Sequence, residues 1–326
     1  MRRRRVALVL ISLLVGCAVK PATIELGPWR APLGREHPLT GRIWDVRAGR
    51  FVSADTVAAA LVSARYVLLG ERHDHPDHHR IQATLVRGLL AAGRRPAVAF
   101  EMFTADDAPV IARQLAAAPR DAAGLARAVD WKRSGWPDWA YYEPIAQAAL
   151  DAGLPIVAAN LAPATARALA RGQRGALAEE FVARHALDRP LPGGGQAALA
   201  TEIREAHCGH LPADRIDGMV LAQRARDAAL ADSMLGAAAA RDGAVLIAGN
   251  GHVRTDRGVP SYLRAREPGA VIVAVAPLEV REGWAQPPDY AAAFEGRVPY
   301  DWVWFTPRLD DVDPCESFRR PPPLRS

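Results

Sequence analysis

Short apolar runs that alternate with helical segments constrain the fold of this chain more than any other feature of its sequence. Such runs at residues 66–70, 97–100, 154–159, 244–249 and 270–275 predict buried strands. Helical patterns occupy residues 78–92, 141–152 and 261–266. Strands that alternate with helices are typical of βαβ units. We therefore predict an α/β fold with a mainly parallel sheet flanked by helices.

The alternation stops between residues 163 and about 240. There the chain is rich in Ala, Arg and Glu at helical spacing, with a flexible break at residues 190–195. We expect a small all-helical insertion subdomain within one α/β domain, which spans residues 51–310. An irregular tether and lead-in at residues 17–50 precedes this domain, and a tail at residues 311–326 follows it. Apolar and polar residues alternate over 300–305, which predicts an edge strand.

The N-terminus has the layout of a cleaved secretory signal. Arg2 to Arg5 are followed by about ten mostly apolar residues, about half of what a bilayer span requires. The next residues, Leu14-Val15-Gly16-Cys17, resemble the lipobox of bacterial lipoproteins, in which the Cys is acylated and becomes the first residue. We expect residues 1–16 to be removed and Cys17 to anchor the chain in the cell envelope. An ordinary signal peptide with a coincidental Cys is the alternative.

Ala18 rather than Asp follows Cys17, which in lipoproteins favours the outer membrane. Removal of the signal also changes the charge. The chain has 41 basic and 36 acidic residues, and four of the arginines lie in the signal. The remaining 37 basic and 36 acidic residues leave a net charge near +1, which gives no indication of nucleic-acid binding. In an oxidising compartment, Cys208 and Cys315 are expected to form a disulfide.

Polar residues collect where the predicted strands end. Glu71 and His73 follow the first strand, Glu101 the second, Asn160 the third and His252 the fourth. Ligands of open parallel sheets bind beyond the carboxyl ends of the strands. Each residue alone can be an ordinary surface carboxylate or loop histidine, but together they predict a site.

Four histidines crowd the start of the helix after the first strand: His73, His75, His78 and His79. Imidazoles bind Zn or Fe well, so the group is a candidate metal cluster. Alternatively, they are solvated side chains near an exposed first helical turn, with Asp74 and Asp77 as helix caps. His73 is the strongest ligand or acid–base candidate because it lies directly beyond the strand.

Tyrosinate and imidazole both ligate haem iron. The candidate haem ligands are therefore Tyr141, Tyr142, His207 and His210. The alternatives are aromatic core residues for the tyrosines, and a helix end at Gly209 for the histidines. The sequence contains no P-loop, nucleophile elbow or dinucleotide fingerprint.

Six motifs in order carry a resemblance to a known family. They are residues 68–74, 100–102, 158–160, 207–209, 222–227 and 248–254. Together they resemble the ChaN-type family of iron-regulated, haem-binding lipoproteins over about residues 50–310. The paired Gly-x-x-His elements at 70–73 and 249–252 are similar to those of the wider superfamily with Tiki, TraB and erythromycin-esterase-like proteins.

The resemblance implies haem held between two subunits by a tyrosine ligand and a histidine partner. The expected partners are haem, the membrane, a second copy of the chain on haem binding and an outer-membrane haem receptor. The wider superfamily implies an alternative, a metal-dependent hydrolase of the protease or esterase type. There, His73 and His252 hold a divalent cation such as Zn, Mn or Co, and Glu71 or Glu101 activates a water. The sequence has no HExxH motif to support that alternative.

Overall fold

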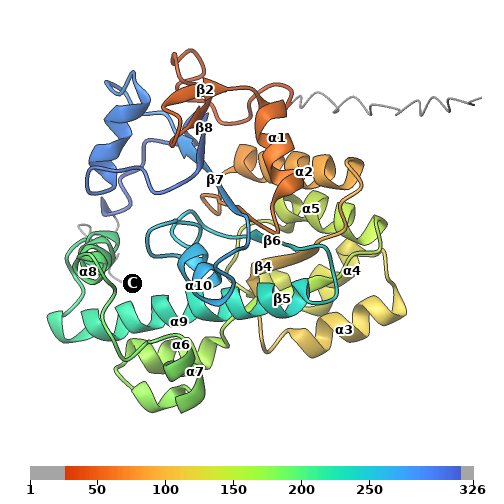
Figure 1. Ribbon diagram of the computed structural model, residues 1–326, viewed down its shortest axis with the longest axis vertical. Coiled ribbons are helices and arrows are strands. Elements are labelled where there is room, and N and C mark those ends of the chain that lie inside the picture. Colours follow the sequence, from red (N-terminus) through yellow and green to blue (C-terminus); the bar gives the residue numbers. More distant parts are fainter. Residues whose placement is uncertain (1–25, 317–326) are drawn as a thin grey trace, which may run out of the picture.

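A single eight-stranded sheet organises the chain in the computed structural model, which describes residues 26–316 (Figure 1). The strand order is β2-β1-β8-β7-β3-β6-β4-β5. Cys17, the signal and the end of the tail lie outside the described residues. The strands are β1 (Ile43–Asp45), β2 (Arg50–Val52), β3 (Tyr66–Leu69), β4 (Ala97–Thr104), β5 (Ile156–Asn160), β6 (Ala244–Ile247), β7 (Ile272–Glu279) and β8 (Trp302–Thr306).

The helices are α1 (Ala54–Ser63), α2 (Pro76–Ala91), α3 (Ala108–Ala117), α4 (Ala122–Ala128), α5 (Trp139–Asp151), α6 (Pro163–Ala170), α7 (Glu179–Arg184), α8 (Gly195–Ala206), α9 (Ala213–Ala238) and α10 (Val259–Arg266). Short 3-10 turns occupy η1 (Trp131–Arg133), η2 (Arg174–Ala176) and η3 (Pro287–Ala293). None of these helices is both long and apolar enough to cross a membrane, a finding that covers only residues 26–316.

Six neighbouring strands, from β8 to β5, run parallel, which confirms the predicted fold class. The expected edge position of residues 300–305 is wrong, because β8 pairs with β7 on one side and with β1 on the other. The edge is instead formed by the β1–β2 hairpin. Most of this hairpin lies within residues 17–50, which were expected to be irregular. Strands of three residues such as these are too short to show a strand period.

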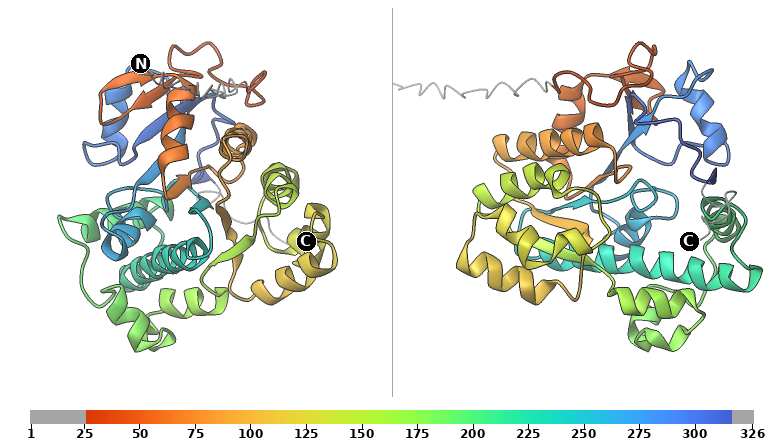
Figure 2. Two further views of the ribbon diagram at one scale, coloured as in Figure 1. Left: turned by 45° about the vertical axis from the view of Figure 1, so that its right-hand side comes forward. Right: turned by 180° about the vertical axis from the view of Figure 1, so that it is seen from behind.

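Side chains alternate between the two faces of the sheet, and helices cover both. Val67 and Leu69 of β3 pack with the helices α1, α2, α4 and α5. Tyr66 and Leu68 point to the other face, where α6, α9 and α10 lie. Figure 2 shows these two helical layers on either side of the strands. Both faces of the parallel strands are therefore buried, which explains their continuous apolar runs.

Residues 163–240 contain only helices and connecting turns, as predicted. The 26-residue α9 is not set apart from the domain, because it packs on β4, β5 and β6. The Sγ atoms of Cys208 and Cys315 form the expected disulfide, which ties the end of the α8 segment to the C-terminal segment. The fold thus brings α9 to the edge of the sheet where the polar residues were predicted to gather.

Candidate functional site

The two Gly-x-x-His loops interlock at the carboxyl end of the sheet. They follow β3 and β6, which are neighbouring parallel strands. A Cβ atom at Gly249 would lie 3.0 Å from Nε2 of His73, and one at Gly70 would overlap the amide of Asn250. Each glycine therefore leaves room for a side chain of the other loop. This close approach is why the loops need glycine at these positions.

Glu71 lies fully buried at the centre of one half of the site. Its Oε1 accepts hydrogen bonds from Tyr142 Oη at 2.9 Å and from His73 Nδ1 at 2.7 Å. Its Oε2 accepts one from Gln82 Nε2 at 2.8 Å. Burial, with the negative charge of Glu71, raises the pKa of Tyr142 well above its usual value. Tyr142 is therefore a neutral hydrogen-bond donor and not a tyrosinate.

Glu101 lies at the centre of the other half. It was expected beyond the second strand, but β4 continues through it, with an irregular register between Phe100 and Thr104. Its Oε1 pairs with Arg226 Nη2 at 2.6 Å and with His252 Nε2 at 3.2 Å. Its Oε2 accepts the backbone N–H of Gly249 at 2.7 Å. Burial alone would raise the pKa of Glu101, but His252 and Arg226 outweigh it and hold that pKa well below its usual range.

His252 bridges two buried carboxylates. Its Nδ1 lies 2.6 Å from Asp227 Oδ1, while its Nε2 faces Glu101. Burial would lower the pKa of His252, but the charges of Glu101 and Asp227 raise it to about 9. At neutral pH this ring is therefore an imidazolium that donates from both nitrogens.

His73 is the solvent-accessible member of the site, with a side chain 36 % exposed. Trp136 packs edge-on against it, with ring centroids 4.9 Å apart. Burial would lower the pKa of His73, but the hydrogen bond to Glu71 and the charge of Glu101 raise it. Its Nε2 lies 4.0 Å from Glu101 Oε1, so His73 connects the two halves of the network.

This donor set does not fit the predicted divalent cation. Both nitrogens of His252 face carboxylates as donors, so neither offers a lone pair to a metal. The Arg226 guanidinium already neutralises Glu101 at the place a cation would take. Within residues 26–316, no group of three or more His, Cys, Asp or Glu side chains is arranged to hold a metal ion.

The other three clustered histidines are buried hydrogen-bonding residues. His75 is the N-cap of α2, a role expected of Asp74 or Asp77. Its ring stacks on that of His78, with ring centroids 3.8 Å apart. His78 accepts the N–H of Arg72 at Nδ1 and donates from Nε2 to Thr306. His79 donates from Nε2 to the carbonyl of His73 at 2.8 Å. They are therefore neither a solvated turn nor a metal cluster.

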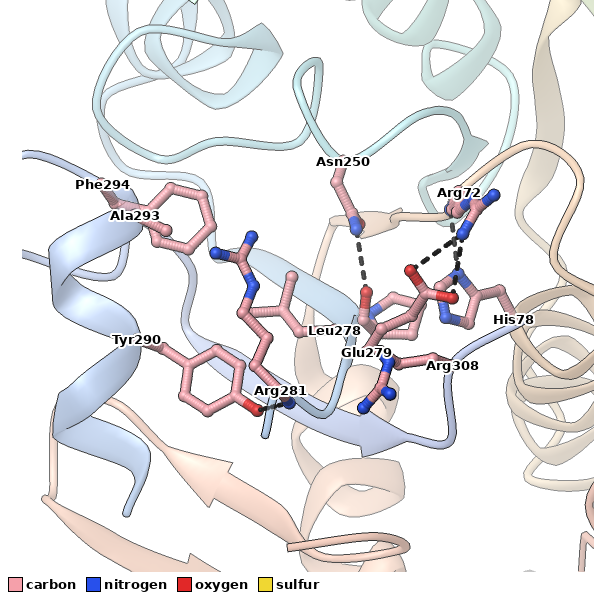
Figure 3. Close-up of a pocket in the computed structure, with 11 residues that line it drawn as sticks. Arg72, His78, Asn250, Leu278, Glu279, Arg281, Tyr290, Ala293, Phe294 and Arg308 are labelled. Carbon is pink, nitrogen blue, oxygen red and sulfur yellow. Dashed lines mark hydrogen bonds and ion pairs between the residues drawn. The ribbon is translucent and has the colours of Figure 1, made fainter. Parts of the chain in front are cut away.

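The outer side of the loops is fastened to β7. Asn250 Nδ2 donates to the carbonyl of Pro277 at 2.8 Å, and Arg72 pairs with Glu279 at 3.1 Å (Figure 3). A pocket of 180 Å³ lies beside these contacts. Arg72 and Asn250 thus point away from His73 and position the loops.

The four candidate haem ligands do not share one site. Tyr142 is buried against Glu71, whereas the neighbouring Tyr141 is only partly buried and lines a pocket between α2 and α5. His207 and His210 follow α8, which Figure 1 shows on the other side of the molecule from α5. His207 Nδ1 donates to the carbonyl of Ile203 at 2.7 Å.

Arg226 and Asp227 are site residues that belong to the motif at 222–227 but were not predicted to take part in the site. They lie on α9, and Arg226 is 125 positions from its partner Glu101. The signal for them was the motif at 222–227 in an Ala-rich helix, and nothing local shows which face of that helix meets the sheet.

Several solved structures are similar to this chain, and the first of them agrees with its fold. ChaN of Campylobacter jejuni, whose structure describes cofacial haem binding, matches with a TM-score of 0.60 and 19% identity, over 80% of this chain and 95% of that chain. The type III effector HopBA1 matches with a TM-score of 0.42 and 15% identity, over 85% of this chain and 97% of that chain. An erythromycin esterase, EreC, matches with a TM-score of 0.41 and 16% identity, over 77% of each chain.

Among curated proteins, none matches this sequence significantly. A family described as haem-binding uptake, Tiki superfamily, ChaN matches residues 57–263, which hold all the residues of the Glu71–His252 network. Because that match covers more than half of the sequence, the chain belongs to the haem-binding ChaN family of the Tiki superfamily.

Proposed function

We propose that this protein is a haem-binding lipoprotein, anchored through Cys17 in the bacterial cell envelope at the outer membrane. It stores haem or hands it over during haem or iron acquisition. Family membership supports the ligand, and the N-terminal sequence supports the anchor. The observation that carries the proposal is the pocket at Tyr141, which is lined by a phenol, three arginines and several apolar residues.

That pocket fits the chemistry of haem. It measures 310 Å³ and is lined by Tyr141, by Arg30, Arg80 and Arg87, and by apolar residues that include Leu26, Ala83 and Pro144. A haem has an apolar ring and two carboxylates, and guanidinium groups bind carboxylates in bidentate geometry. Tyrosinate is a ligand of ferric haem. Tyr141 would therefore hold the iron, and Arg30 and Arg87 would hold the propionates, since Arg80 already pairs with Asp77.

The position of Tyr141 favours it over Tyr142 as the ligand. The Tyr141 ring stacks on His79 with centroids 5.4 Å apart, which orients the phenol at the pocket. Tyr142 is 0% exposed and donates to Glu71. An iron atom could reach its oxygen only if the core opened.

The pocket also lies near the proposed anchor. Leu26 lines it, and the nine residues from Cys17 to Leu26 span at most about 32 Å. Haem would therefore bind close to the membrane, where an outer-membrane haem receptor could deliver or accept it. At 310 Å³ the pocket is at the small end of the range of about 300–1,000 Å³ for ligand pockets. We extend the proposal to a homodimer whose second copy covers the exposed part of the haem.

Hemin titration of the purified protein tests this function. Wild type should shift the Soret band with saturation, and Tyr141→Phe should weaken binding and change the spectrum, since it removes the phenolate. Tyr142→Phe is the matched control and should keep the wild-type Soret position. Sizing before and after hemin addition tests the dimer. Binding that is unchanged in Tyr141→Phe would reject Tyr141 as the ligand. The variants His207→Ala and His210→Ala then test the other candidates, and no Soret shift in wild type would reject the function.

The alternative of a metal-dependent hydrolase is not supported by the geometry of the site. His252 is held as an imidazolium by Asp227 and Glu101, and it would have to lose a proton and a carboxylate partner to bind a metal. Uptake of stoichiometric Zn, Mn or Co by the purified protein, and loss of that uptake in His252→Gln, would contradict this conclusion.

A further inference from the structure

Arg224 is a buried cation that takes no part in the Glu101 network. It lies on α9, two residues before Arg226, and is 5% exposed. Its guanidinium donates only to backbone carbonyls, from Nη1 to Arg189 at 2.7 Å and from Nη2 to Ala186 at 2.9 Å. These bonds hold the turn after α7, but a carbonyl carries no net charge.

No counter-ion accompanies this buried charge. Among residues 26–316, Arg224 forms no ion pair, and its Nε has no hydrogen-bond partner. The buried Tyr262 hydroxyl lies beside the guanidinium and interacts with it, but it is uncharged and does not neutralise Arg224. Removing a cation from water without an opposite charge is costly. A buried guanidinium without an ion-pair partner is therefore a candidate binding group for an anion.

Arg224 lines a pocket of 190 Å³ whose lining comes mainly from α9 and from the segment that connects α7 with α8. Two further arginines, Arg174 and Arg189, line the same pocket. Within the described residues, neither side chain forms an ion pair. Arginines from three separate segments of the chain therefore line one small space.

The rest of the lining limits the ligand. Asp188, Asp217 and Gln196 are polar, and Leu187, Pro190, Val220 and Leu221 form the apolar part. The two aspartates favour a ligand that carries an ammonium group next to its anionic group. A volume of 190 Å³ is below the range of about 300–1,000 Å³ typical of drug-sized ligands, so the pocket accepts a small metabolite and not a haem.

We propose that this pocket binds a small oxyanion, a carboxylate or phosphate group, on the guanidinium groups of Arg224, Arg174 and Arg189. An amino-acid-like zwitterion satisfies both the arginines and the aspartates, whereas free phosphate satisfies the arginines alone. Bidentate contacts of a planar guanidinium suit either oxyanion. The site is separate from the pocket at Tyr141, so its test does not depend on haem binding.

Isothermal titration of the purified protein at low ionic strength tests this proposal, with L-alanine, acetate and inorganic phosphate as probes. We expect saturable binding of at least one probe at one site per chain. Since each charged hydrogen bond contributes about 1.5–3 kcal/mol, Arg174→Gln and Arg189→Gln should each weaken binding about tenfold or more. Arg204→Gln is the matched control on the exposed side of α8 and should bind as wild type does.

Arg224→Lys keeps the charge but loses the planar fork, and it should weaken binding most. This variant can lose its fold, since the carbonyls after α7 lose their donor. In that case Arg174→Gln and Arg189→Gln decide whether the pocket binds an anion. Tightest binding of L-alanine identifies the zwitterion as the ligand type, and tightest binding of phosphate identifies a phosphate. The absence of saturable binding for all three probes overturns the proposal. Equal affinity in wild type, Arg174→Gln and Arg189→Gln also overturns it, since it shows an adventitious ion only.

Discussion

Gly249 lies directly against the ring of His73, so close that a Cβ atom there would be 3.0 Å from Nε2 of His73. The contact joins two loops that are far apart in sequence. It also sets the His73 ring between Glu71, at 2.7 Å, and Glu101, at 4.0 Å. The two Gly-x-x-His motifs are therefore one structural unit, in which each glycine is required by a side chain of the other loop.

Gly249→Ala should displace the His73 ring and destabilise the fold by about 1–3 kcal/mol, the usual cost of overpacking. The backbone of Gly249 is not in the left-handed region, so the effect is steric. Urea denaturation gives the free energy of unfolding. Gly251→Ala is the matched control in the same loop, because its new Cβ would have 3.8 Å to the nearest atom. Equal stability of the two variants would show that the close approach is unimportant.

Glu101→Gln should destabilise the protein by about 3–5 kcal/mol, because it leaves the buried His252 and the partly buried Arg226 without their shared carboxylate. Chemical denaturation at pH 7 measures the loss. Glu180→Gln, at an exposed position on α7, is the control and should change stability by no more than about 0.5 kcal/mol. A loss of less than 1 kcal/mol in Glu101→Gln would contradict the ionic network.

His252 should make the protein less stable at alkaline pH. Its pKa in the folded state is about 9, above the value of about 6.5 in an unfolded chain. Protonated His252 therefore adds about 3 kcal/mol to the free energy of unfolding. This contribution is complete below pH 6.5 and is lost as the pH rises through 9. Because the pKa of His73 is also raised, the comparison is between His73→Gln and the double variant His73→Gln/His252→Gln. The double variant should show the flatter profile of unfolding free energy between pH 6.5 and 9.

The stacked pair His75 and His78 should have the opposite effect at acid pH. Burial lowers the pKa of both rings, and it holds the pKa of His78 well below its usual value. Stability from their neutral forms is complete above pH 6.5, and as the pH falls towards the lowered pKa of each ring it decreases by at most about 1.4 kcal/mol per pH unit for that ring. Melting temperatures at pH 7, 6 and 5 measure the slope. His78→Gln should lower stability at pH 7 but give a shallower acid slope, and an unchanged slope would exclude His78 as the cause.

The disulfide between Cys208 and Cys315 should stabilise the oxidised protein. It closes a loop with a sequence separation of 107 residues, so it restricts the unfolded chain and contributes about 2–4 kcal/mol. Dithiothreitol should lower the midpoint of urea unfolding by the corresponding amount. The double variant Cys208→Ser/Cys315→Ser is the control, and its midpoint should be the same with and without the reductant.

The fold class and the edge of the sheet that carries the site could be predicted because their signals are local. The apolar runs of β3, β4, β6 and β7 are visible in sequence, and in parallel strands their carboxyl ends lie at one edge. Glu71, His73, Glu101 and His252 were found in this way, and the structure brings all four together.

The sequence by itself therefore determined the parallel α/β architecture, the strands from β3 to β8 along the chain and the loops that form the site. Only the tertiary structure decided which charges pair, because Arg226 and Asp227 reach Glu101 and His252 through the packing of α9 on the sheet. It also decided that His75, His78 and His79 are buried, and that β8 lies inside the sheet. The physical reason is the distance along the sequence over which each feature is decided. Strand and helix periods are set by neighbouring residues, whereas burial and ion pairing depend on residues that meet only when the chain has folded.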